Sequence, residues 1–113
     1  MSKYEQIQRL VADAQEGYSC PIFVPRQGSF RHGSYLEPDK CFICLLTAAY
    51  VKHHNIKDQS ILEVDCCQIT EWAEAEYGIT WNRATEVFDS PNRACDPIYQ
   101  PIIEYSKELF PSN

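Results

Sequence analysis

The sequence predicts a small, mainly α-helical domain, and three observations lead to this fold class. Apolar residues recur at helical spacing in several segments, a Pro/Gly-rich stretch interrupts them at 18–38, and one central segment is apolar on every side. We therefore expect four helices around a buried central helix, with one small hairpin near 22–36 that would make the fold α+β. The 113 residues correspond to a single compact domain, 1–113.

The first helix is expected over 2–16, followed by the hairpin. Ser2 and Glu5 form the Ser-x-x-Glu pattern of a capping box, and Gly17 is placed to end the helix. The hairpin strands are predicted at 22–24 and 30–36, around a turn at 26–29. The apolar side chains of the helix share one stripe, formed by Tyr4, Ile7, Leu10, Val11 and Ala14.

The most apolar segment follows Pro38 and is expected to be the central helix. Asp39 is predicted to cap its start, and no charged residue occurs from Cys41 to Val51. A helix that is apolar all round is normally buried at the centre of its domain. Its last turn would hold Lys52, His53 and His54, where positive charge is favourable and where histidines are usually solvated.

Two further helical regions complete the prediction. Residues 58–78 are expected to break at Asp65, because an unbroken helix would place that carboxylate on the apolar side. Asp65 and Gln68 then form a second capping box, and Gly78 ends the helix. The last helix is predicted from Asp96–Pro97 to Phe110, with its start delayed by Pro101. Its apolar stripe consists of Ile98, Ile102, Tyr105 and Leu109.

The charge of the chain is concentrated in one segment. The net charge is −6, and residues 58–78 hold six acids but no Lys or Arg, while the rest of the chain is balanced. Such a segment disfavours direct nucleic-acid binding and favours a basic protein partner, although a merely solvated helix face is the alternative. The acids expected to contact the partner are Glu63, Glu71 and Glu74.

The Pro/Gly-rich stretch is the second candidate surface. Arginines alternate there with aromatic residues and a histidine, a pattern that anchors protein interfaces or stacks on bases. Two arginines are too few for a nucleic-acid footprint, and the alternative is a hairpin whose aromatics close over the core. The candidate binding residues are Arg26, Phe30, Arg31, His32 and Tyr35.

The pair Cys41 and Cys44 forms a Cys-x-x-Cys motif with three possible meanings: core packing, half of a zinc site, or a redox pair. A thioredoxin-like site needs a βαβ frame, and no parallel strand is predicted before Cys41. A zinc site needs a second short-spaced pair, whereas Cys66 and Cys67 are adjacent and would diverge by about 100° on a helix. Packing is preferred, no cofactor is expected, and these two cysteines are the runner-up metal ligands.

The run CFICLLTAAY, with TWNRATEVF further along, resembles a family of small uncharacterised microbial and phage proteins. The resemblance covers about 41–88 and implies a compact helical fold and a microbial or viral setting, without an activity. The matching positions are Cys41, Cys44, Leu45, Leu46, Ala48, Trp81, Asn82, Thr85 and Val87.

The function expected from these observations is non-catalytic protein binding. The chain has no Gly-rich phosphate loop and no hydrolase or metalloprotease motif. A small acidic inhibitor or adaptor of phage type, acting on a basic nucleic-acid-binding host protein such as a defence complex, is the leading hypothesis. A zinc-stabilised domain and a thiol-dependent enzyme are the alternatives. Without a signal-peptide core or an apolar run of about 20 residues, a cytoplasmic location with reduced cysteines is expected.

Overall fold

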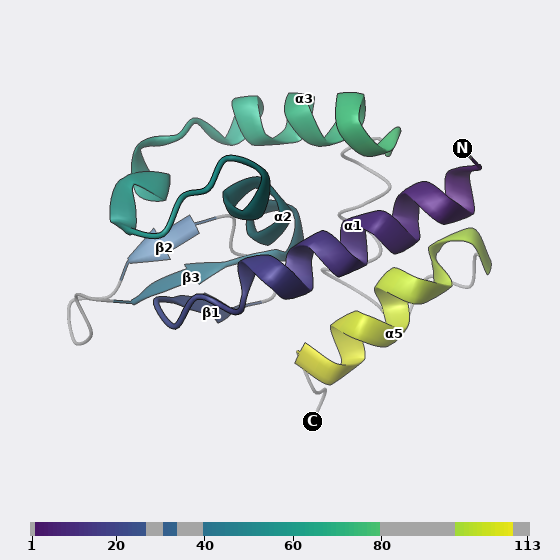
Figure 1. The fold of residues 1–113 in the computed structure, drawn as a ribbon, viewed down its shortest axis with the longest axis horizontal. Coiled ribbons are helices and arrows are strands. Elements are labelled where there is room, and N and C mark those ends of the chain that lie inside the picture. The colour runs from purple at the N-terminus through teal and green to yellow at the C-terminus, as the bar shows by residue number, and fades with distance from the viewer. Residues whose placement is uncertain (1, 27–30, 34–39, 80–96, 110–113) are drawn as a thin grey trace.

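The computed structural model describes residues 2–26, 31–33, 40–79 and 97–109 (Figure 1). Within these ranges the chain is mainly α-helical with a small β element, as predicted. The helices are α1 (Lys3–Gly17), α2 (Leu45–His53), α3 (Cys66–Tyr77) and α5 (Gln100–Leu109), with 3-10 turns η1 (Gln59–Glu63) and η2 (Pro97–Tyr99). The strands are β1 (Phe23–Pro25), β2 (Arg31–Gly33) and β3 (Cys41–Ile43).

Helix α2 forms the centre of the core. All seven of its side chains from Leu45 to Val51 are buried, because helix α1, helix α3 and strand β3 lie around it. Helix α1 packs along α2 and also contacts α3 and α5. The predicted stripe of α1 supplies Ile7, Leu10 and Ala14 to this core, whereas Tyr4 is 47% exposed near the start of the helix.

The end of α1 approaches α2 so closely that only glycine fits there. A Cβ at Gly17 would lie 2.0 Å from the carbonyl oxygen of Ala48. Gly17 is itself the last helical residue, and Tyr18 caps the helix in a right-handed conformation. The glycine was predicted as a helix stop, but its physical role is the close contact between two helices.

We therefore expect Gly17→Ala to destabilise the fold by about 1–3 kcal/mol, the usual cost of overpacking. The clash is with backbone, which cannot rotate away, and it outweighs the gain of about 1 kcal/mol in helix propensity from glycine to alanine. Chemical denaturation measures the effect, with the exposed Gln15→Ala as control in the same helical turn. A Gly17→Ala protein as stable as wild type would contradict the close α1–α2 contact.

The helix ends follow local capping chemistry. Ser2 Oγ accepts from Glu5 N at 3.2 Å, and Asp65 Oδ1 accepts from Cys67 N at 2.8 Å, so the N-caps predicted at these two residues are confirmed. Gly78 ends α3 with φ of 67°, as predicted. The expected bond from Gln68 back to Asp65 is wrong as a capping box, because the Gln68 side chain instead donates to the Tyr50 hydroxyl.

The C-terminus of α2 closes through an asparagine. Asn55 has φ of 53°, the left-handed conformation that asparagine tolerates better than most residues. Its backbone N–H donates to the Lys52 carbonyl, and the backbone N–H of Ile56 donates to the Val51 carbonyl. These two bonds form a Schellman motif, which turns the chain sharply away from the helix.

The β element differs from the predicted hairpin. Strands β1 and β2 both exist but do not pair, because β3 lies between them in the order β1–β3–β2. Strand β3 is parallel to β1, with Phe23 opposite Cys41, and antiparallel to β2, with Gly33 opposite Cys41. The hairpin prediction is therefore wrong in its pairing, and a three-residue central strand replaces it.

The same strand moves the start of the central helix. Residues Cys41–Ile43 were predicted as helix, with Asp39 as the cap; instead α2 begins at Leu45, and Cys44 is its N-cap residue. An apolar run of this kind suits a buried strand as well as a buried helix. The last helix begins as predicted, one 3-10 turn late, at Gln100. In the described ranges no helix is both long and apolar enough to cross a membrane.

Candidate functional site

The acidic segment contains three acids that cap helices or form an ion pair and three acids that are exposed. Asp58 and Asp65 cap η1 and α3, and Glu76 forms an ion pair with Arg9 of α1 at 3.0 Å. The other three, Glu63, Glu71 and Glu74, are exposed. Helix α3 exposes Glu71 and Glu74 because its opposite side, with Ile69, Ala73 and Tyr77, is buried, whereas Glu63 is the last residue of η1.

The Arg/aromatic surface is only partly within the described residues. Arg26 is exposed at the end of β1, and its guanidinium lies 5.2 Å from the ring centre of Phe42. Arg31 and His32 belong to β2, whose backbone pairs with β3. Phe30 and Tyr35 lie outside the described residues. Strand β2 packs beside η1, which carries Glu63, so the two predicted surfaces adjoin at that point.

Cys41 and Cys44 lie on different elements and both are buried. Cys41 is in β3, where burial, helped by Asp58 and Cys20, raises the pKa of its thiol. The Cys44 sulfur lies 3.5 Å from Thr47 Oγ1 inside the core. Among the described residues no three His, Cys, Asp or Glu side chains gather closely enough to hold a metal. Strand β1 precedes Cys41 and runs parallel to β3, so the prediction that no parallel strand precedes Cys41 is wrong.

A buried carboxylate that was not predicted from the sequence links three helices. Asp13 of α1 is only 7% exposed. Its Oδ2 accepts from the Tyr77 hydroxyl at 2.7 Å and contacts His53 Nε2 at 2.7 Å, and its Oδ1 accepts from Lys52 Nζ at 3.1 Å. We call these four residues the Asp13 cluster. Because an ionised carboxylate only accepts hydrogen bonds, the contact with Asp13 makes His53 Nε2 the donor nitrogen of the ring.

The electrostatics of the Asp13 cluster favour its charged form. Burial by itself raises the pKa of Asp13, but hydrogen bonds from Tyr77, His53 and Lys52 outweigh it, so the pKa lies below its ordinary value. Burial and the Asp13 carboxylate raise the pKa of Tyr77 far above its ordinary value, so the hydroxyl remains a donor. His53 is thus not the simply solvated helix-end residue that was expected.

Aromatic rings continue this cluster along the seam between α2 and α3. Trp72, which is partly buried, lies 5.2 Å from the His53 ring and 5.5 Å from the His54 ring, measured between ring centres. His54 stacks on Tyr50 at 3.9 Å, and Tyr50 meets Trp72 edge-on at 5.3 Å. The seam fixes α3 on α2 and thereby orients the exposed acids of α3 outward.

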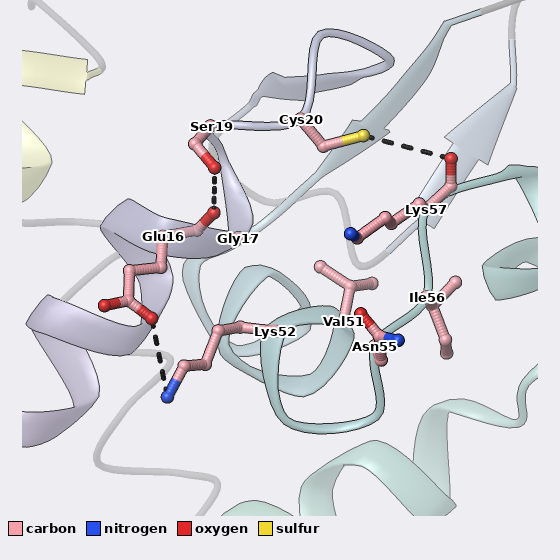
Figure 2. Close-up of a pocket in the computed structure, with 9 residues that line it drawn as sticks. All are labelled: Glu16, Gly17, Ser19, Cys20, Val51, Lys52, Asn55, Ile56 and Lys57. Atoms are coloured by element: carbon pink, nitrogen blue, oxygen red, sulfur yellow. Dashed lines mark hydrogen bonds and ion pairs between the residues drawn. The ribbon is translucent and has the colours of Figure 1, made fainter.

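One hollow of about 350 Å³ lies where α1 and α2 both end (Figure 2). The last turn of α1 and the turn after it form one wall, and the end of α2 with the chain leading to η1 forms the other. Lys52 belongs both to the lining of the hollow and to the Asp13 cluster. The lining consists of Glu16, Gly17, Ser19, Cys20, Val51, Lys52, Asn55, Ile56 and Lys57.

No protein-family model, no curated protein and no solved structure matches this chain. The described residues offer three arrangements that could serve a function: an exposed acidic face, the Asp13 cluster, and the hollow.

The Asp13 cluster had one signal in the sequence. Asp13 lies three residues after Leu10 and next to Ala14, so it falls beside the apolar stripe of its helix. A carboxylate in that position needs partners, because a buried charge without them is costly. Its partners lie 39, 40 and 64 residues away along the chain, and no local pattern connects them.

Proposed function

We propose that this protein is a non-catalytic protein-binding domain that engages a basic partner through the outward face of η1 and α3. The observation that carries the proposal is the orientation of α3. Its apolar side is packed into the core, and Glu71 and Glu74 are exposed on the other side in a segment without Lys or Arg. We call Glu63, Glu71 and Glu74 the acidic face.

Physical chemistry supports this use of the acidic face. Like charges three residues apart on a helix repel weakly, so Glu71 and Glu74 contribute no stability through each other. A complementary basic surface removes that repulsion and is steered toward the face over long range. The finer proposal is a nucleic-acid-binding protein as partner, with this chain acting as an inhibitor or adaptor of phage type, for example against a host defence complex.

The alternatives have less support in the described residues. A zinc-stabilised domain and a thiol-dependent enzyme both depend on Cys41 and Cys44. These thiols are buried, on a strand and at a helix start, and Cys44 contacts Thr47 in the core. Packing explains both positions.

Reversing two charges tests the proposal. With the Glu71→Lys/Glu74→Lys protein, we expect association with the captured basic partner to slow about tenfold at low salt, because electrostatic steering is lost. Folding should be nearly unchanged, since exposed charges contribute little to stability. Affinity capture from the native source, with wild type and variant as paired baits, provides the partner, and association rates at two salt concentrations provide the measurement.

A matched control distinguishes an effect of the acidic face from an effect of the overall net charge. Glu104→Lys/Glu108→Lys makes the same charge change at two exposed positions of α5 and should leave the association rate nearly unchanged. Equal rates for the α3 variant, the α5 variant and wild type would mean that the acidic face is only solvated. Loss of binding with Arg31→Ala but not with the α3 variant would move the interface to the β2 side.

A further inference from the structure

The hollow in Figure 2 is built from residues that the proposed function does not use. Its volume of about 350 Å³ lies within the range of small-molecule sites, about 300–1,000 Å³. Val51 and Ile56 provide apolar surface, and Ser19 and Asn55 provide polar groups. The hollow can therefore hold a small molecule with both apolar and polar parts.

The lining of the hollow carries more positive than negative charge, whereas the chain as a whole is acidic. Two lysines and one glutamate line it, in a chain whose net charge is −6. Lys52 bonds Asp13 at 3.1 Å and Glu16 at 3.5 Å, which leaves one of its three ammonium donors. Lys57 forms no ion pair with any residue of the described ranges. Lys57 thus favours a carboxylate of the ligand, and the Glu16 carboxylate, one oxygen of which already pairs with Lys52, favours an ammonium group.

A thiol stands at the edge of this charged hollow. Cys20 is partly exposed, and its sulfur lies 3.9 Å from the backbone oxygen of Lys57 (Figure 2). Cys41 and Cys44 are buried, and burial raises the pKa of Cys41, which disfavours the reactive thiolate there. Cys67 is exposed, but it lies on α3 and not in the hollow.

We propose that the hollow is a modification site, where Cys20 forms a mixed disulfide with a small thiol compound that carries carboxylates and an ammonium group. The oxidant is the disulfide form of that compound. Cys20 loses its proton to solvent, and its thiolate attacks one sulfur of the disulfide. The reagent's S–S bond breaks, a new S–S bond to Cys20 forms, and the other half leaves as a thiolate. Cys20 is oxidised, and the leaving half is reduced.

Two disulfides of opposite charge test this site on the full chain. Oxidised glutathione carries carboxylates and ammonium groups, whereas cystamine carries only ammonium groups. The reduced protein is treated with each, and peptide mapping by mass spectrometry gives a rate for each cysteine. We expect Cys20 to prefer glutathione disulfide relative to Cys67, which serves as the exposed reference beside the acidic residues of α3.

A lysine variant then tests the hollow itself. Lys57→Gln should slow the reaction of Cys20 with glutathione disulfide by about three- to fivefold, the size expected for loss of one partly screened charge contact. Its effect on Cys67 should be negligible. Lys3→Gln removes the same charge at the far end of α1, about 20 Å away by helix geometry, and is the control.

Two results would overturn the proposed modification site. If Cys20 and Cys67 show the same preference between the two disulfides, the hollow recognises nothing. If Lys57→Gln changes the Cys20 rate no more than Lys3→Gln does, Lys57 does not contact the reagent. Either result would leave Cys20 as an ordinary accessible thiol, and the proposed protein-binding function would be unaffected.

Discussion

Replacing Leu45 with alanine is expected to lower the free energy of unfolding by about 2–5 kcal/mol, the range for a leucine cavity in a packed core. Leu45 is fully buried, and so are its neighbours along the first two turns of α2. Such a site cannot collapse around the missing atoms without moving α1, which is already in close contact with α2 at Gly17. Chemical denaturation with a two-state fit measures the loss.

The matched control is Leu62→Ala in η1. It is the same substitution at a side chain that is only partly buried and packs against the edge of the core. Its cost should be clearly smaller than that of Leu45→Ala, because less apolar surface leaves water there on folding. A loss below about 0.5 kcal/mol for Leu45→Ala would show that α2 is not the centre of the domain.

The sequence predicted those elements whose signals are local. Ser2, Asp65 and Gly78 mark helix ends, and each depends on groups within four residues along the chain. The burial of α2 was also predictable, because a helix that is apolar on every side has no face that water solvates well. Strand β3 was not, since Cys41–Ile43 belongs to a continuous apolar run, and only its pairing with β1 and β2 distinguishes a strand from a helix there.

The candidate sites depend more on contacts between distant residues. The exposure of Glu71 and Glu74 followed from helical periodicity, and the structure places both as exposed. The structural roles of Asp58, Asp65 and Glu76 were only partly predictable, because Arg9, the partner of Glu76, lies 67 residues away. The hollow could not be predicted at all, since it forms only where the ends of α1 and α2 meet.

Replacing Asp13 with asparagine is expected to destabilise the protein by about 3 kcal/mol at pH 7, the lower end of the range for breaking a buried charge pair. Asparagine keeps one acceptor oxygen but replaces the other with an amide donor, so at least one of Tyr77, Lys52 and His53 faces a donor where it needs an acceptor. The lower end applies because the Lys52 and His53 side chains are 33% and 28% exposed and remain partly solvated. Glu71→Gln removes one exposed carboxylate and should leave the stability unchanged.

The effect of Asp13 should disappear in acid. Because its pKa is lowered in the folded state, its contribution is present above about pH 4, the ordinary range of an aspartate, and is lost as the pH falls through the folded value. The difference in stability between wild type and Asp13→Asn should therefore narrow below about pH 4. Tyr77→Phe removes one hydrogen-bond donor that lowers the pKa of Asp13. In this variant the stability contributed by Asp13 should therefore be fully lost at a higher pH than in wild type. A constant difference between wild type and Asp13→Asn from neutral pH into acid would show that asparagine disturbs packing there, and that the charge of Asp13 does not hold α1, α2 and α3 together.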